Sequence, residues 1–139
     1  MTLQATTYTK PLPEITRWSK PFWDACNAHK LIVQRCVQCG RYHMPAAELC
    51  PKCSAKLEWV SASGRGKVHT FTIFHVAYNP AFKDDLPYNV SVIELEEGPL
   101  LLSNVVNCAN AELCIDMPVR VVFEDVTSEQ TLPRFEPDR

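Results

Sequence analysis

The sequence predicts a mainly β protein in which an N-terminal helix and a small metal-binding ribbon precede a five-stranded barrel. Two cysteine pairs, each separated by two residues, predict the ribbon. Five segments rich in β-branched and aromatic residues, all after a glycine-containing stretch at 61–66, predict the barrel. The expected division is an arm and helix at 1–30, the ribbon at 31–62 and the barrel domain at 66–136.

The first thirty residues are expected to form an extended arm and a short helix. Residues 1–13 are polar with two prolines, as is typical of an arm. Ser19 is a plausible N-cap, and Pro21 would sit in the first turn, where its missing N–H costs nothing. Trp18 and Phe22 fall on one helical face, which indicates a packing surface either for this chain or for another one.

The cysteine quartet predicts one tetrahedral metal site. Strands expected at 31–35 and 41–45 would enter and leave the first pair, and Gly40 would permit the tight reversal between them. Four thiolates select zinc, or iron in a rubredoxin-like centre, over calcium or magnesium. With all four positions filled by sulfur, the metal is expected to be structural. The ligands are Cys36, Cys39, Cys50 and Cys53.

Two disulfides are the competing interpretation of the same cysteines. The chain has seven cysteines, an odd number, and no signal-peptide pattern precedes the motif. We therefore expect reduced thiols and a cytoplasmic protein. No apolar run approaches the roughly 20 residues that a membrane-spanning helix needs.

The second half of the chain is typical of the partly open barrel called the OB-fold, with a small SH3-like barrel as the alternative. The apolar residues of the first two expected strands alternate, but they change to the other face after Ile73 and again between Val92 and Ile93. Such a change predicts bulged or bent strands. Pro133 indicates an edge strand. A helical stretch is expected at 109–113, and the long loop at 79–87 is a candidate binding loop. The strands are expected at 68–78, 88–95, 100–106, 118–126 and 131–135.

Charge divides the chain into two unlike halves. Residues 1–67 carry ten Lys or Arg against four Asp or Glu, a net charge of +6, whereas residues 68–139 carry four against twelve, a net charge of −8. An acidic barrel repels a polyanion, so single-strand nucleic-acid binding is kept only as the alternative function. The basic residues are either a solvated surface or a site for a compact phosphorylated ligand.

No group of residues in the sequence marks an active site. Cys108 and Cys114 lie near the expected short helix, and His69 lies in the first barrel strand, but no spacing pairs a nucleophile with a base. A buried cysteine usually serves packing. We expect no catalytic residue, although an enzyme that uses Cys108 or Cys114 stays open.

The order of these parts resembles a known family, which joins a rubredoxin-like zinc ribbon to an acyl-CoA-associated OB-fold. The likeness covers residues 14–136. The combination of its motifs is specific to the family, whereas each motif alone is not. It is carried by Pro21-Phe22-Trp23, Leu31-Ile32-Val33-Gln34-Arg35-Cys36, Cys50-Pro51-Lys52-Cys53, Ser63-Gly64-Arg65-Gly66-Lys67-Val68, and Gly98-Pro99 before a leucine-rich strand.

The resemblance implies a non-catalytic accessory subunit with one structural zinc. Similar proteins associate with thiolase-like enzymes, including thiolases and lipid-transfer-protein-type aldolases, which make or break carbon–carbon bonds in acyl-CoA substrates. The small subunit would help to bind the CoA portion, in agreement with the basic half. We expect Trp18, Phe22 and Trp23 to contact the partner enzyme. The expected CoA contacts are Lys30, Arg35, Arg41, Arg65 and Lys67.

Overall fold

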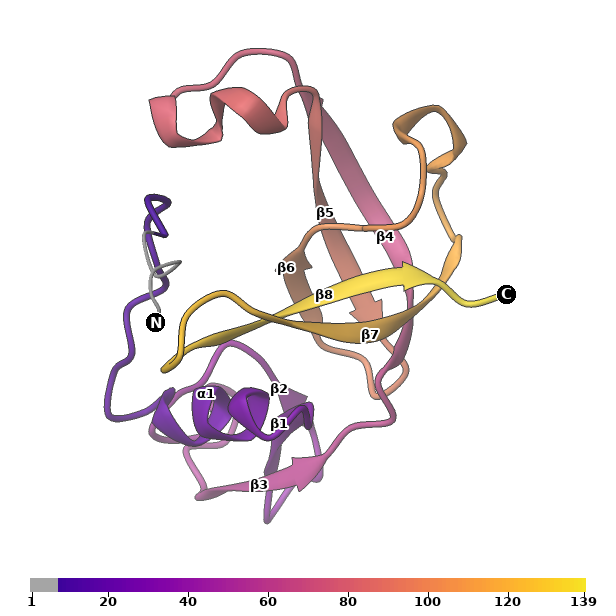
Figure 1. Cartoon of the computed structure of the whole chain (residues 1–139). Helices are drawn as coiled ribbons and strands as arrows, with labels where there is room; N and C mark the ends of the chain where they lie inside the picture. Colours follow the sequence, from indigo (N-terminus) through magenta and orange to yellow (C-terminus); the bar gives the residue numbers. More distant parts are fainter. Residues whose placement is uncertain (1–7) are drawn as a thin grey trace.

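The computed structural model describes residues 8–139, so the first seven residues of the expected arm lie outside the described part (Figure 1). The chain is mainly β and places the helix and ribbon at one side of a curled sheet. In chain order the elements are α1 (Lys20–Asn27), β1 (Ile32–Cys36), β2 (Tyr42–His43), β3 (Leu57–Ser61), β4 (Arg65–Phe74), the 3-10 helix η2 (Pro80–Asp85), β5 (Tyr88–Leu95), β6 (Leu100–Ser103), the 3-10 helix η3 (Asn110–Glu112), β7 (Pro118–Asp125) and β8 (Thr131–Pro137).

Helix α1 begins where the sequence predicts it. Ser19 occupies the N-cap position and Pro21 lies in the first turn. The Ser19 hydroxyl does not cap the helix; it accepts the N–H of Thr16 at 3.0 Å. Phe22 and Cys26 are buried on the face that packs against β1 and β8. The helix therefore connects the ribbon to the barrel.

The ribbon is a three-stranded antiparallel sheet in the order β2-β1-β3. Gln34 in its central strand is buried, and its amide is satisfied by the backbone of one residue. Its Nε2 donates to the carbonyl of Ala47 at 3.0 Å, and its Oε1 accepts the Ala47 N–H at 2.9 Å. These two bonds hold the loop that leads to the second cysteine pair.

The second sheet confirms the OB-fold. Its strands lie antiparallel in the order β6-β5-β4-β7-β8, and a parallel bridge between Val105 and Phe135 joins its two edges. The expected short helical stretch is present as η3 between the third and fourth barrel strands. Pro133 lies in β8 at the edge of the sheet, where its missing N–H is tolerated.

Of the two irregularities predicted in the strands, the one between Val92 and Ile93 coincides with a register shift in the β4–β5 ladder, and the one after Ile73 does not. Strand β4 ends at Phe74, and the ladder with β5 shifts between Val68 and Thr70, so the predicted slip after Ile73 is wrong. The apolar residues that suggested it, Val76 and Tyr78, lie exposed in the following loop.

Strand β5 keeps a regular alternation of burial along its whole length, so the extra residue at the Val92–Ile93 step lies in the opposite strand, β4, between Val68 and Thr70. Its inward face begins with the polar residues Asn89 and Ser91, which made the apolar pattern look shifted. Asn89 Nδ2 donates to the carbonyl of Val105, and Asn89 Oδ1 accepts the Val105 N–H, both at 2.8 Å. Buried polar groups thus fix the closed end of the barrel.

One hydrophobic core runs through the ribbon and the barrel. Phe22 and Val33 from the ribbon side belong to the same buried cluster as Ile93 and Phe135 from the barrel. Polar contacts support this junction, because His29 Nε2 lies 2.8 Å from Asp125 Oδ1. The two sheets are consequently one packed unit in which each supports the other.

The glycine-containing stretch between the sheets is ordered structure. Gly64 is buried at φ +83°, where an L side chain is strained, and a Cβ there would lie 2.9 Å from Val121. Gly66 is inside β4, where a Cβ would lie 2.5 Å from the carbonyl oxygen of Glu94. Both glycines allow close approach of neighbouring strands.

Among residues 8–139, the structure has no helix that is long and apolar enough to cross a membrane.

Gly66→Ala should destabilise the barrel, because the new methyl group meets the β5 backbone, which cannot move without breaking the β4–β5 ladder. We expect the free energy of unfolding to fall by about 1–3 kcal/mol. Urea unfolding checks this value. The matched control is Thr72→Val at an exposed position of β4, which should change it by less than about 0.5 kcal/mol. An unchanged Gly66→Ala protein would contradict the close approach.

Candidate functional site

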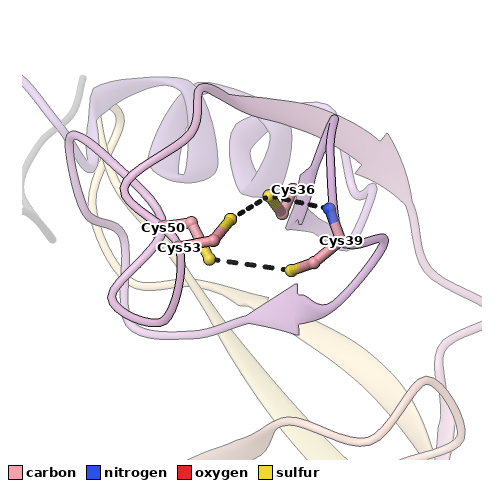
Figure 2. A group of neighbouring side chains, drawn as sticks. All are labelled: Cys36, Cys39, Cys50 and Cys53. Carbon is pink, nitrogen blue, oxygen red and sulfur yellow. Dashed lines mark hydrogen bonds between the residues drawn. The ribbon is translucent and has the colours of Figure 1, made fainter.

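The four cysteines predicted as metal ligands converge on one point (Figure 2). All four sulfur atoms lie within 4.8 Å of one another. The Sγ atoms of Cys36 and Cys53 are 3.3 Å apart, and those of Cys39 and Cys50 are 3.9 Å apart. Zinc–sulfur bonds of about 2.3 Å at tetrahedral angles require edges of about 3.8 Å. The geometry and the soft donors therefore fit a single structural zinc.

Matching backbone turns build the two halves of the site. The Gly40 N–H donates to the carbonyl of Cys36 at 3.0 Å, and the Ser54 N–H donates to that of Cys50 at 2.8 Å. Gly40 and Ser54 have positive φ angles of 74° and 63°, which reverse the chain after each pair. Each turn brings two sulfur atoms inward from a short stretch of sequence.

Backbone N–H groups stabilise the thiolate of Cys36, the form in which a cysteine binds a metal. The N–H of Cys39 lies 3.3 Å from Cys36 Sγ, and this bond, with that of Gln38, lowers the pKa of the Cys36 thiol to about 6. His43 lies beside the quartet, with Nε2 3.2 Å from Cys50 Sγ, close enough for a ring N–H to donate to the sulfur. When bound, the zinc cross-links the two cysteine turns. His43 supports the ligand Cys50 through a hydrogen bond to its sulfur and does not itself bind the metal.

A second feature, which the sequence did not predict, is an apolar groove of about 740 Å³. Phe22 and Trp23 of α1 and Met44 of the ribbon form one wall, and Leu101 and Leu132 belong to the opposite wall. Residues 8–13 cross one side of it. Only packing of the ribbon against the barrel creates this space. The uninterrupted leucines of β6, which lack the usual alternation, are the one local sign of it.

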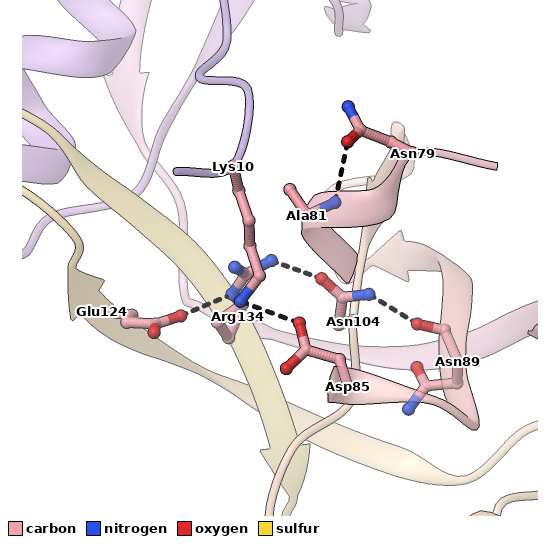
Figure 3. Close-up of polar contacts among 8 residues, drawn as sticks. All are labelled: Lys10, Asn79, Ala81, Asp85, Asn89, Asn104, Glu124 and Arg134. Atoms are coloured by element: carbon pink, nitrogen blue, oxygen red, sulfur yellow. Dashed lines mark hydrogen bonds and ion pairs between the residues drawn. The ribbon is translucent and has the colours of Figure 1, made fainter. Parts of the chain in front are cut away.

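Asn104 and Arg134 are polar residues that line the groove, and Figure 3 shows their contacts with neighbouring side chains. Arg134 Nε donates to Glu124 Oε1 at 3.0 Å, and Arg134 also donates to Asn104. The arm is held nearby, because Lys10 Nζ lies 2.7 Å from Asp85 Oδ2, and this hydrogen bond raises the pKa of Lys10. The loop at 79–87, expected to bind a ligand, contacts the chain's own arm.

The aromatic residues predicted to contact a partner have different surroundings. Phe22 is only 4% exposed and belongs to the core of its own chain, so it has little surface to offer. Trp23 packs edge-to-face on Phe22 at 5.0 Å and lines the groove. Trp18 is 36% exposed, with the Arg17 guanidinium 4.4 Å from its ring centroid. Trp18 and Trp23 are therefore the accessible members.

The five cations predicted to contact CoA are all exposed, in two groups. Lys30, Arg35 and Arg41 belong to the ribbon side. Arg65 and Lys67 project from β4, where Arg65 lies 3.9 Å from Asp138 and Lys67 lies 3.7 Å from Asp116. Within the described residues, no carboxylate bridges one group to the other. The structure thus keeps these charges available at the surface.

Two thiols outside the quartet, those of Cys26 and Cys108, have raised pKa values. Burial, and then Glu112, raise the pKa of Cys108, and its Sγ donates to the carbonyl of Ala109 at 3.4 Å. Burial raises the pKa of Cys26 to about 12. A nucleophilic thiol needs the opposite shift. Cys114 is exposed in the turn after η3.

Comparison with known proteins gives two matching family descriptions and several relatives. Residues 23–58 match "ChsH2, rubredoxin-like zinc ribbon domain", and residues 59–124 match "ChsH2, C-terminal OB-fold domain". A "DUF35 domain-containing scaffold protein" of Methanocaldococcus jannaschii is 39% identical over 101 residues, which cover 71% of each chain. These matches include both the cysteine quartet and most of the barrel.

A longer relative and a solved structure extend the likeness. A "Probable enoyl-CoA hydratase alpha subunit" of Thermomonospora curvata is 35% identical over 92% of this chain, which spans only 40% of that protein's length. A solved chain described as "Ltp2-ChsH2(DUF35) aldolase" superposes with a TM-score of 0.82 and 34% identity. The alignment covers 91% of this chain and 98% of that chain.

Cys39→Ala should abolish zinc binding and unfold the ribbon, since metal-binding energy is folding energy in a site of this kind. We expect purified wild-type protein to hold about one zinc per chain and the variant to hold almost none. Metal analysis with near-ultraviolet circular dichroism measures both effects. Cys114→Ala, which removes an exposed thiol outside the quartet, should retain the metal. A folded Cys39→Ala ribbon would rule out the structural role.

Proposed function

Because this chain belongs to the DUF35 family, which joins a ChsH2-type rubredoxin-like zinc ribbon to a ChsH2 C-terminal OB-fold domain, we propose that it is a non-catalytic accessory subunit of an enzyme complex. Its partner is a thiolase-like or lipid-transfer-protein-type enzyme. The accessory subunit binds this enzyme and helps to hold the CoA portion of acyl-CoA substrates during carbon–carbon bond formation or cleavage.

The superposition on the chain of the Ltp2-ChsH2(DUF35) aldolase is the observation that carries this proposal. The alignment covers 98% of that solved chain, so the likeness extends over nearly all of it. The name of the Methanocaldococcus relative, a scaffold protein, favours the same non-catalytic role. The closed zinc site agrees, since four sulfur ligands leave no position for a substrate.

The surface cations supply the chemistry for CoA. CoA carries several phosphate charges, and exposed Arg and Lys side chains bind phosphate through charge-assisted hydrogen bonds. Arg65 and Lys67 alternate along β4 and so share one face, and their carboxylate partners lie at the long distances of 3.9 and 3.7 Å. Such loose pairs are worth little in water and exchange readily for a phosphate.

The relative from Thermomonospora favours a second kind of partner. Its name is that of a hydratase subunit, and it matches 92% of this chain. A hydratase-type partner would keep the accessory role and the CoA contacts and change only the reaction. A single-strand nucleic-acid binder is disfavoured by the net charge of −8 on residues 68–139.

Affinity purification of this chain from its native host should recover one enzyme subunit in a defined ratio. Mass spectrometry identifies that subunit, and its sequence separates a thiolase-like partner from a hydratase. Trp18→Ala should weaken the complex by at least tenfold, because exposed aromatic residues dominate hot spots. Tyr78→Ala, an exposed aromatic on another loop, is the control. Recovery of the chain alone, with salt-sensitive binding to an oligonucleotide, would refute the accessory role.

The double variant Arg65→Glu, Lys67→Glu should bind CoA at least tenfold more weakly in the complex, because charge-assisted bonds to phosphate are lost. Calorimetric titration with CoA measures the dissociation constant. Lys83→Glu, which reverses an exposed cation on η2, serves as the control and should bind CoA normally. Equal affinity of both variants would remove these two residues from the CoA site.

A further inference from the structure

Within residues 8–139, strand β6 is an edge strand that no other strand pairs on its outer side. It pairs with β5 through residues 100–103 and is the last strand on that side of the sheet. Leu100 is 45% exposed and Leu102 is 68% exposed, although both are large apolar residues. Edge strands with exposed apolar side chains are the places where another chain adds to a sheet.

Hydrogen-bonded and non-bonded residue pairs alternate between β5 and β6, and this alternation shows which main-chain groups of β6 do not bond to β5. The Leu95 N–H donates to the carbonyl of Pro99 at 2.9 Å, so this antiparallel pair is a hydrogen-bonded one. Such pairs alternate with non-bonded pairs. In the observed register, Leu101 is therefore bonded to Ile93, whereas the main-chain groups of Leu100 and Leu102 point away from β5.

Strand β8 joins β6 at one end only. Phe135 N–H donates to the carbonyl of Asn104 at 3.1 Å, and Val106 N–H donates to that of Phe135 at 2.7 Å. Ser103 Oγ makes the last contact, to the carbonyl of Pro133 at 2.8 Å. Beyond Ser103 the two strands diverge, and the apolar groove lies between them. The barrel thus stays open along Leu100–Leu102.

The main-chain groups and the uncharged residues at this opening favour a peptide as its ligand. Two N–H groups and two carbonyls point into it, and an apolar chain that displaced their water would leave these groups without hydrogen-bond partners. Of the groove-lining residues within 8–139, only Arg134 carries a full charge, and Glu124 offsets it. The groove therefore complements a backbone with uncharged side chains and offers no counter-charge for an ionic one.

We propose that an extended, uncharged segment of the partner subunit adds to β6 as a sixth strand and closes the open side of the barrel. This inference rests on the proposed accessory function and names the contact through which it acts. The segment bonds to the main chain of Leu100 and Leu102, and its apolar side chains pack on Trp23 and Leu132.

Amide hydrogen exchange in the complex purified from the native host, compared with the isolated chain, tests the proposal. The N–H groups of Leu100 and Leu102 should exchange at least tenfold more slowly in the complex. The free edge of β3 in the ribbon is the internal control and should not change. A complex in which residues 100–103 exchange as in the isolated chain would overturn the added strand and leave the accessory function intact.

Two variants of Leu102 distinguish a contact made by its main chain from a contact made by its side chain. Leu102→Pro removes an N–H that β5 does not use, so the sheet should fold with its zinc while affinity for the partner falls at least tenfold. Leu102→Ala should cost clearly less, and Ile115→Ala, an exposed aliphatic residue outside the groove, should cost nothing. Equal losses for proline and alanine would indicate an apolar ligand and contradict the strand.

The remaining outcomes are also decisive. Protection of β6 that grows with the concentration of the isolated chain would assign the edge to a second copy of this protein. If Leu102→Pro does not fold, the exchange measurement on wild-type protein still decides. Failure to recover any partner would remove the proposed function, and the added strand with it.

Discussion

The structure depends on holding four sulfur atoms at the corners of one tetrahedron. The ribbon has a sheet of only three short strands, and its buried residues are too few to fold alone. Coordination of Cys36, Cys39, Cys50 and Cys53 ties its two turns together. The ribbon can then present Val33 to the common core and Met44 to the groove. Zinc thus stabilises a surface at some distance from itself.

The barrel is closed at one end and open at the other for a physical reason. Asn89 and Ser91 replace apolar residues on the inward face of β5, and their hydrogen bonds hold Val105 beside Phe135. In the described part of the chain, no such bonds hold the leucines of β6 against β8, and residues of the ribbon line the groove beside them. A groove between two walls results, which suits a subunit that binds another chain.

The sequence predicted the architecture well and the details of the strands less well. The helix start, the metal ligands, the OB-fold and the edge position of Pro133 follow from local chemistry, and the structure confirms them. The slip predicted after Ile73 is wrong because exposed apolar residues such as Tyr78 violate the usual pattern, whereas the slip predicted between Val92 and Ile93 lies opposite the observed register shift of β4. Periodicity identifies the apolar face of α1 that carries Phe22 but not what covers it, and the structure buries Phe22 in the core of its own chain.

The sequence by itself determined the metal site, the order of the modules and the division of charge, because cysteine spacing and composition act over short stretches of chain. Only the tertiary structure decided where the groove lies, which aromatic residues remain accessible and which edge of the sheet is free. These properties depend on contacts between segments that are far apart in the sequence, such as those of Trp23 and Leu132. They also depend on the hydrogen-bonding register of the five-stranded barrel sheet.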